Sequence, residues 1–202
     1  MSLDMASIHQ FISAELGSSH TISQSMERVI DECSQQSPHD DWTTLRELPY
    51  DAIDELRDWI ATPFILDPPK TALAGLWFGL FNPEYDGKGA ADIYVCGSHR
   101  FFADPNDNSW AVGPDWWPEH RYAHSSLLRD LYQIAYRRGG LGNDAEYPLC
   151  LGYGGFVIRD LLRGIRPETM LAESISLGVA VGFDSGDFVL VGTLTRRGLQ
   201  PA

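Results

Sequence analysis

The chain has 202 residues, a hydrophobic fraction of 44%, a net charge of −13 and a pI of about 4.7. Its length and composition are those of a globular protein, for which we expect one domain and no membrane partner. An acidic protein repels phosphate backbones, so direct nucleic-acid binding is not expected, and no stretch approaches the roughly 20 apolar residues of a membrane span.

The first third of the chain is predicted to be helical. Apolar residues at helical spacing end at Gly17, which supplies a stop signal. Thr21 and Gln24 form a capping-box pattern that begins a second amphipathic helix. A third helix is predicted to start near Asp51 and to end before Pro63.

Two pairs of apolar runs predict strands. They are residues 71–82 with 90–97, and residues 175–183 with 187–195. Asp86-Gly87 lies inside the first connection and predicts a hairpin or a longer link, whereas Asp184-Ser185-Gly186 predicts a hairpin turn for the second pair.

Two further helices are predicted between these strand pairs. The first begins at Pro118, a residue favoured in the first turn, and stops at Gly139-Gly140. The second follows Pro148 and ends near Gly164.

This order of elements does not alternate as βαβ units. We therefore predict an α+β fold, in which an antiparallel sheet built from two hairpins packs against several helices. Residues 1–202 are expected to form a single α+β domain, with an acidic helical part at 1–62 and a part with sheet and helices at 71–202.

The negative charge is concentrated near the N-terminus. Residues 1–68 carry thirteen acidic side chains against three arginines, a net charge of −10, whereas the remaining residues have a net charge of −3. Asp51, Asp54, Glu55 and Asp58 form one acidic face on the predicted third helix. This field attracts a basic partner, and it also keeps a protein soluble.

Cysteine usage predicts the compartment. Cys33, Cys96 and Cys150 are odd in number and far apart, and they match neither a disulfide framework nor a zinc motif. A reducing cytoplasm is the simplest context, because the N-terminus also lacks the basic and apolar regions of a signal peptide.

A weak metal motif lies in the 104–124 segment. His120 and His124 would share one face of a helix that begins at Pro118, and Asp104 is the candidate third ligand. The Asp/Asn-rich loop that starts at Asp104 also matches part of a calcium loop, although it lacks the turn glycine, and such loops commonly form Asx turns instead.

No nucleophile or cofactor motif is complete. Cys96 and His99 are close in sequence, but a buried strand cysteine is the simpler interpretation. Phosphate-loop, dinucleotide and nucleophile-elbow patterns are missing, so no cofactor is predicted. Arg159, Arg163 and Arg166 form a stripe that either binds an anion or pairs within the protein.

Aromatic residues are dense in one irregular segment. Trp110, Trp116, Trp117 and Tyr122 fall within thirteen residues. Large rings in a loop either cover the core or anchor a partner.

The size, acidity, tryptophan content and missing catalytic motifs are similar to those of bacterial immunity proteins, which neutralise toxins from neighbouring cells. This compositional resemblance implies a basic protein partner. We therefore expect a non-enzymatic cytoplasmic interaction protein, of immunity type, that uses its acidic face and aromatic loop. The alternative is a metal-assisted hydrolase or a small-molecule-binding protein centred on residues 104–124, and a homo-oligomer that covers the aromatic segment is a third hypothesis.

Overall fold

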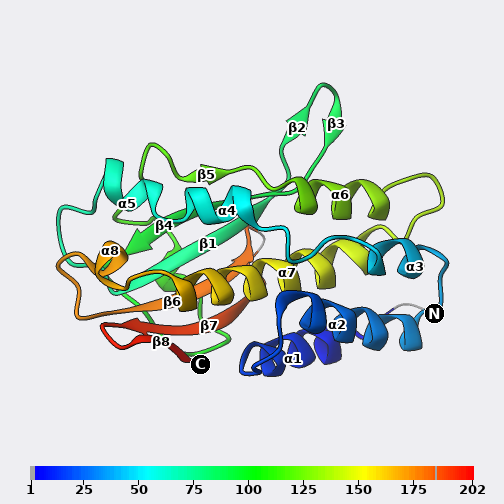
Figure 1. Ribbon diagram of the computed structural model, residues 1–202, viewed down its shortest axis with the longest axis horizontal. Helices are drawn as coiled ribbons and strands as arrows, with labels where there is room; N and C mark the ends of the chain where they lie inside the picture. Colours follow the sequence, from blue (N-terminus) through cyan, green and yellow to red (C-terminus); the bar gives the residue numbers. More distant parts are fainter. Residues whose placement is uncertain (1–2, 185) are drawn as a thin grey trace.

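The computed structural model describes residues 3–184 and 186–202 (Figure 1). The helices are α1 (Met5–Leu16), α2 (Ile22–Gln36), α3 (Asp41–Arg46), α4 (Asp54–Trp59), α5 (Thr62–Leu66), α6 (Ser126–Ala135), α7 (Asn143–Gly164) and α8 (Glu168–Leu171), with a 3-10 turn η1 (Ser109–Ala111). The strands are β1 (Gly75–Phe81), β2 (Glu84–Tyr85), β3 (Lys88–Gly89), β4 (Asp92–Ser98), β5 (Tyr122–Ala123), β6 (Ser176–Phe183), β7 (Phe188–Thr195) and β8 (Gly198–Pro201).

Local sequence signals explain the first two helices. Gly17 is the C-cap of α1, and its N–H donates hydrogen bonds to the carbonyls of Ala14 and Glu15 in the last turn of that helix. The predicted capping box is confirmed at α2, where the Thr21 side chain accepts from the N–H of Gln24 and the Gln24 side chain accepts from the N–H of Thr21 at 3.0 Å.

The sheet is mixed, which corrects the predicted all-antiparallel arrangement. Both predicted strand pairs are present and antiparallel, β1 with β4 and β6 with β7. The two pairs join through a parallel contact between β1 and β6, in the order β5-β4-β1-β6-β7-β8. The long crossover from β4 through α6, α7 and α8 makes this parallel pairing sterically accessible. The predicted turn at Asp184-Ser185-Gly186 falls partly outside the described residues, because Ser185 is not among them.

Two predicted helix starts are wrong. The chain after Pro118 makes a turn and then pairs with β4 through β5, and α6 begins only at Ser126, where the side chain of Ser125 accepts from the N–H of Leu128. Helix α7 begins at Asn143 and contains Pro148. That proline has no N–H to donate to the carbonyl of Asp144, so α7 lacks one helical hydrogen bond near its start.

Helix α7 is the centre of the main hydrophobic core. It packs on one face of the sheet, against β6, β7 and β8, and its other sides contact α1, α2 and α6 (Figure 1). A helix that is enclosed on all sides is buried along most of its length, and α7 fits this rule. The core includes side chains from both the N-terminal helices and the sheet.

The opposite face of the sheet carries a second, aromatic layer. Its buried members are Trp77, Tyr94, Cys96, Trp110, Ala180 and Phe188. The central parallel strands present glycines to this layer, with Gly75 opposite Gly178 and Gly79 opposite Gly182. A Cβ atom at Gly75 would lie 2.7 Å from the Trp110 ring, so the rings occupy the space that side chains would otherwise fill.

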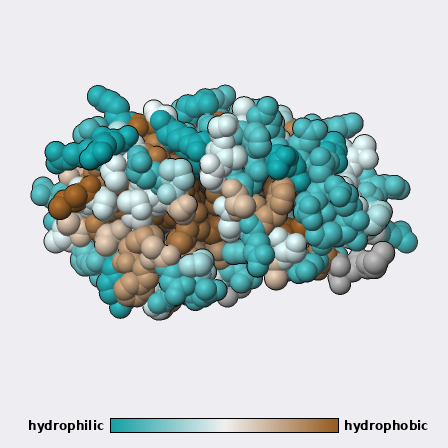
Figure 2. Space-filling view, turned by 90° about the horizontal axis from the view of Figure 1, so that it is seen from below, coloured by the Kyte–Doolittle hydropathy of each residue, from teal (hydrophilic) through white to brown (hydrophobic). Residues whose placement is uncertain are grey.

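The surface differs between the two ends of the molecule. Seen from the side of α1 and β8, apolar residues gather over the part that holds the strands, and hydrophilic residues cover most of the end formed by α1 and α2 (Figure 2). No helix in the described part of the chain combines the length and the apolar character needed to cross a membrane.

Replacing Gly79 tests the aromatic layer. In Gly79→Ala the new methyl group would overlap the ring of Tyr94, so we expect the free energy of unfolding to fall by about 1–3 kcal/mol. Urea denaturation measures this change. Gly164→Ala is the matched control, since a Cβ there meets no atom within 4 Å, and its stability should be unchanged or slightly higher. Equal stability of the two variants would contradict the argument.

Candidate functional site

The aromatic segment divides into buried and exposed rings. Trp110 is completely buried and meets Trp77 edge to face, with ring centroids 6.1 Å apart. Trp116 is buried on the helical side of the sheet, and its Nε1 donates to the carbonyl of Asp67 at 2.8 Å. Trp117 is 46% exposed. Of the three predicted tryptophans, two cover the core and one is presented to solvent.

Trp117 belongs to an exposed aromatic sandwich. The guanidinium carbon of Arg121 lies 4.8 Å from the Trp117 ring centroid and 4.6 Å from that of Tyr122. Tyr122 is 49% exposed. Both rings also contact Tyr94, at centroid distances of 5.5 and 6.0 Å. These contacts hold Trp117, Arg121 and Tyr122 in one arrangement, and we call the three residues the aromatic sandwich.

The base of the sandwich is fixed by a hydrogen bond. The Tyr94 hydroxyl donates to Oδ1 of Asp184 at 2.7 Å. Burial raises the pKa of Tyr94, and the hydrogen bond to the Asp184 carboxylate raises it further. Tyr94 therefore stays a hydrogen-bond donor over the whole physiological pH range.

The four predicted acidic residues differ in what they contact. Asp51 accepts from the hydroxyl of Ser23 at 2.6 Å, and Asp54 pairs with Arg57 within α4. Glu55 accepts from the N–H and the hydroxyl of Ser126, both at 2.7 Å. Asp58 is exposed and has no side-chain partner among the described residues.

Helix α4 lies beside β5, the edge strand of the sheet (Figure 1), and the aromatic sandwich contains Tyr122 of the same strand. The Trp59 side chain of α4 donates from Nε1 to the carbonyl of His120 at 3.0 Å, and its ring meets Phe78 on the helical side of the sheet. The sandwich packs on Tyr94, which belongs to the aromatic layer on the other face. The acidic residues of α4 thus lie on one side of β5 and the sandwich on the other.

The predicted metal geometry is wrong because residues 118–125 are not helical. His120 lies on a turn and His124 directly follows a short strand, so their spacing of four does not place them on one helix face. The Asp104 carboxylate accepts from the N–H of Asn106 at 2.9 Å, and Asp107 accepts in the same way from Ser109. These are Asx turns, the alternative to a calcium loop. No group of three or more metal-ligating side chains converges in the described part of the chain.

His124 instead belongs to a polar cluster around a buried carboxylate. Asp92, only 1% exposed, accepts from the hydroxyl of Tyr85 at 2.5 Å and from Nη2 of Arg129 at 3.1 Å. Nδ1 of His124 lies 3.3 Å from the same oxygen, and Oδ1 accepts from the N–H of Ser125. The cluster fastens the β2–β3 hairpin to the start of α6.

The cysteines are structural. Cys33, Cys96 and Cys150 are all free and buried. Burial raises the pKa of Cys96 to about 12, so the thiol near His99 in the sequence is protonated at neutral pH and is a poor nucleophile.

The predicted arginine stripe also pairs within the protein. Arg159 is buried and donates to the carbonyls of Glu15 and His20, and Arg163 donates to that of Ser18. At these two positions the stripe joins α7 to the end of α1, which is the structural alternative.

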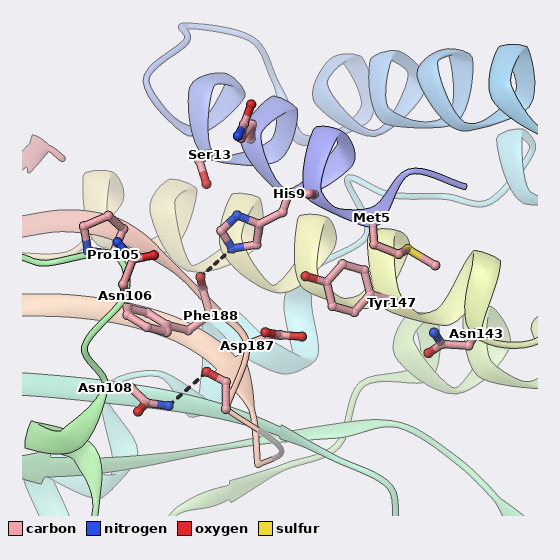
Figure 3. Close-up of a pocket in the computed structure, with 13 residues that line it drawn as sticks. Met5, His9, Ser13, Pro105, Asn106, Asn108, Asn143, Tyr147, Asp187 and Phe188 are labelled. Carbon is pink, nitrogen blue, oxygen red and sulfur yellow. Dashed lines mark hydrogen bonds between the residues drawn. The ribbon is translucent and has the colours of Figure 1, made fainter. Parts of the chain in front are cut away.

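A pocket with a volume of about 860 Å³ lies between α1, the loop at 105–108, the β6–β7 connection and the start of α7 (Figure 3). Nε2 of His9 donates to the carbonyl of Phe188 at 2.7 Å, which leaves Nδ1 as the acceptor of the neutral ring. The Asn108 side chain donates to the carbonyl of Gly186 at 2.9 Å and ties the loop to the β6–β7 connection. Tyr147 and Asp187 point into the same space (Figure 3).

Sequence patterns give little sign of this pocket. His9, Asn143, Tyr147 and Asp187 come from three distant segments and have no shared spacing. Only the Asp/Asn-rich loop stands out in the sequence, and its Asn106 and Asn108 fall within the 104–124 segment. Comparisons of the chain with protein-family models, curated proteins and solved structures found no match.

The Glu55–Ser126 contact predicts a pH-dependent stability. The hydrogen bonds from Ser126 hold the pKa of Glu55 below its usual value, so the carboxylate stabilises the fold above its ordinary pKa and loses this effect as the pH falls through the folded-state pKa. At pH 7 we expect Glu55→Gln to lower the free energy of unfolding by about 0.5–1 kcal/mol, since a charge at the start of α6 is lost.

Thermal unfolding of both proteins between pH 7 and pH 3 checks this expectation. The difference in unfolding free energy between Glu55→Gln and the parent should narrow once the pH falls below about 4.3, the ordinary pKa of glutamate, and should vanish below the lowered pKa of the folded state. Asp58→Asn, on the same helix but without a side-chain partner among the described residues, should show no such difference. A difference as large at pH 3 as at pH 7 would mean that the carboxylate charge is not its cause.

Proposed function

We propose that this protein is a non-enzymatic interaction protein that captures a basic protein partner at strand β5. The binding surface, called here the β5 edge surface, consists of the aromatic sandwich on one face and Asp54 and Asp58 of α4 on the other. The compositional similarity to bacterial immunity proteins makes a basic toxin the class of partner that we favour.

The observation that carries this proposal is the pre-formed aromatic sandwich. Tryptophan, tyrosine and arginine are the residue types most enriched among interface residues that dominate binding energy. Here one of each is stacked on the next, and the two rings are 46% and 49% exposed. Side chains already held in one geometry lose less conformational entropy when a partner binds.

Charge supports a basic partner. The whole chain has a net charge of −13, and residues 1–68, which include α4, contribute −10 of this charge. Asp58 is not neutralised by any described residue, and Arg57 balances only Asp54. The Arg121 charge within the sandwich is covered by two aromatic rings. A long-range negative field speeds the encounter with a basic partner, and the sandwich then supplies short-range contacts.

The short strand β5 allows a partner to contact both faces of the sheet at this edge. It has two residues, Tyr122 and Ala123, and pairs with only Tyr94 and Ile93 of β4. A partner that covers this edge would touch the sandwich on one face and α4 on the other. It would also cover backbone groups that an edge strand leaves unpaired.

Display selection tests the proposal while the natural partner is unidentified. We expect peptides selected from a random library on the immobilised protein to be enriched in lysine and arginine, and to bind more weakly as salt is raised. Trp117→Ala should lower the affinity for the selected peptides at least about tenfold, as expected for an anchoring ring. The double variant Asp54→Asn/Asp58→Asn should reduce the salt dependence.

Matched controls lie elsewhere on the surface. Phe102 is 41% exposed and lies outside the sandwich, so Phe102→Ala should leave the affinity unchanged. Glu168→Gln/Glu173→Gln removes two exposed charges near α8 and should not change the salt dependence. Selected peptides without a basic bias, or peptides indifferent to Trp117→Ala, would overturn the proposal.

A further inference from the structure

The pocket beside α1 is separate from the β5 edge surface and has a chemistry of its own (Figure 3). Its walls come from α1, the loop at 105–108, the β6–β7 connection and the N-terminal part of α7. The volume of about 860 Å³ falls within the range of small-molecule sites.

The polar groups of the pocket are mostly neutral and can both donate and accept hydrogen bonds. The walls contain the carboxamides Gln10, Asn106, Asn108 and Asn143 and the hydroxyls of Ser13 and Tyr147. Asp187 supplies the one carboxylate, and neither lysine nor arginine occurs among the described lining residues. Such a lining gives no permanent positive charge to hold a phosphate or a carboxylate ligand.

Several of these groups have no partner within the protein. Among the described residues, no side chain or backbone group is hydrogen-bonded to the Asn143 carboxamide, the Tyr147 hydroxyl or the Asp187 carboxylate. Together they offer donors and acceptors side by side. The pKa of Tyr147 is raised to about 12, first by burial and then by the charge of Asp187, so its hydroxyl keeps its proton.

Aromatic and apolar walls complete the pocket. The Phe188 ring is buried at its base, and Met5, Ala6 and Pro105 line its sides. The Tyr147 ring is stacked on Phe183, with centroids 5.8 Å apart and planes inclined by 21°. This stacking holds the ring in place beside the unpartnered polar groups.

From this combination we infer that the pocket binds a neutral polyhydroxylated ligand, a mono- or disaccharide. Each sugar hydroxyl both donates and accepts, and it is therefore satisfied by adjacent carboxamide, hydroxyl and carboxylate groups. The C–H face of a sugar ring packs against an aromatic side chain, which the half-buried Tyr147 provides. Asp187 adds a charged acceptor, whose hydrogen bonds are stronger than those of neutral groups.

Titration of the ¹⁵N-labelled protein with glucose, N-acetylglucosamine and maltose, each up to about 50 mM, tests this inference at the weak end of measurable affinities. We expect at least one sugar to shift the backbone amide signals of Asn106, Asn143 and Asp187 and to saturate. Tyr147→Phe and Asp187→Asn should each lower the affinity for that sugar about five- to tenfold, because each substitution removes or weakens one hydrogen bond but keeps the shape of the side chain.

Tyr132→Phe is the matched control, since this tyrosine of α6 has no hydrogen-bonded hydroxyl among the described residues and lies outside the pocket. It should bind the sugar like the parent protein. The absence of pocket shifts with all three sugars would overturn the inference, as would saturating shifts there with putrescine or inorganic phosphate alone. Trp117→Ala should leave sugar binding unchanged, so failure at this pocket and failure at the β5 edge surface are distinguishable.

Discussion

The fold depends on close contact between glycines of the sheet and aromatic rings of the sheet and of the segment that follows β4. Gly75, Gly79, Gly178 and Gly182 leave gaps on one face of the central parallel strands, and the rings of Trp77, Tyr94, Trp110 and the half-buried Phe101 fill them. The helical face is covered by α7. The sheet is therefore buried on both faces although regular helices cover only one of them, and an irregular segment takes the place of a second helical layer.

The same segment connects the two candidate binding regions. Trp110 fixes its middle against the sheet, and the loop just before it reaches the pocket, where Asn108 bonds Gly186. Beyond it, Trp116 pairs with Gly97 through backbone hydrogen bonds in both directions, and the chain then presents Trp117 to solvent. Anchoring at these points gives a loop without regular secondary structure the rigidity that a binding surface requires.

Sequence patterns predicted the elements whose signals are local. The Thr21–Gln24 capping box, the stop at Gly17 and the two antiparallel strand pairs each depend on neighbouring residues, and all are present. The parallel contact of β1 and β6 joins residues about one hundred positions apart and has no local signal. The helix start predicted at Pro118 was wrong. Proline is favoured in the first turn of a helix, but here the chain that follows is extended by backbone pairing with β4.

The candidate sites were harder to predict for a related reason. Trp110, Trp116 and Trp117 have similar sequence surroundings, and tertiary packing alone separates them: Trp110 is buried in the aromatic layer, Trp116 is buried in the core on the helical side, and Trp117 lies half exposed against Tyr94. The acids of α4 were recognised as a face, but the sequence does not show that Glu55 caps α6 while Asp58 stays free among the described residues. Pocket residues such as His9 and Tyr147 meet only through tertiary packing.

The three buried thiols give each layer of the molecule its own chemical reporter. Cys33 lies in the outer helix α2, Cys150 in the central helix α7 and Cys96 in strand β4 of the sheet. A thiol reagent reaches a buried cysteine only when the surrounding structure opens, so the rate of alkylation at each position measures the opening of one layer. The native chain thus carries a built-in means of resolving whether outer helices, central helix and sheet unfold together or in succession.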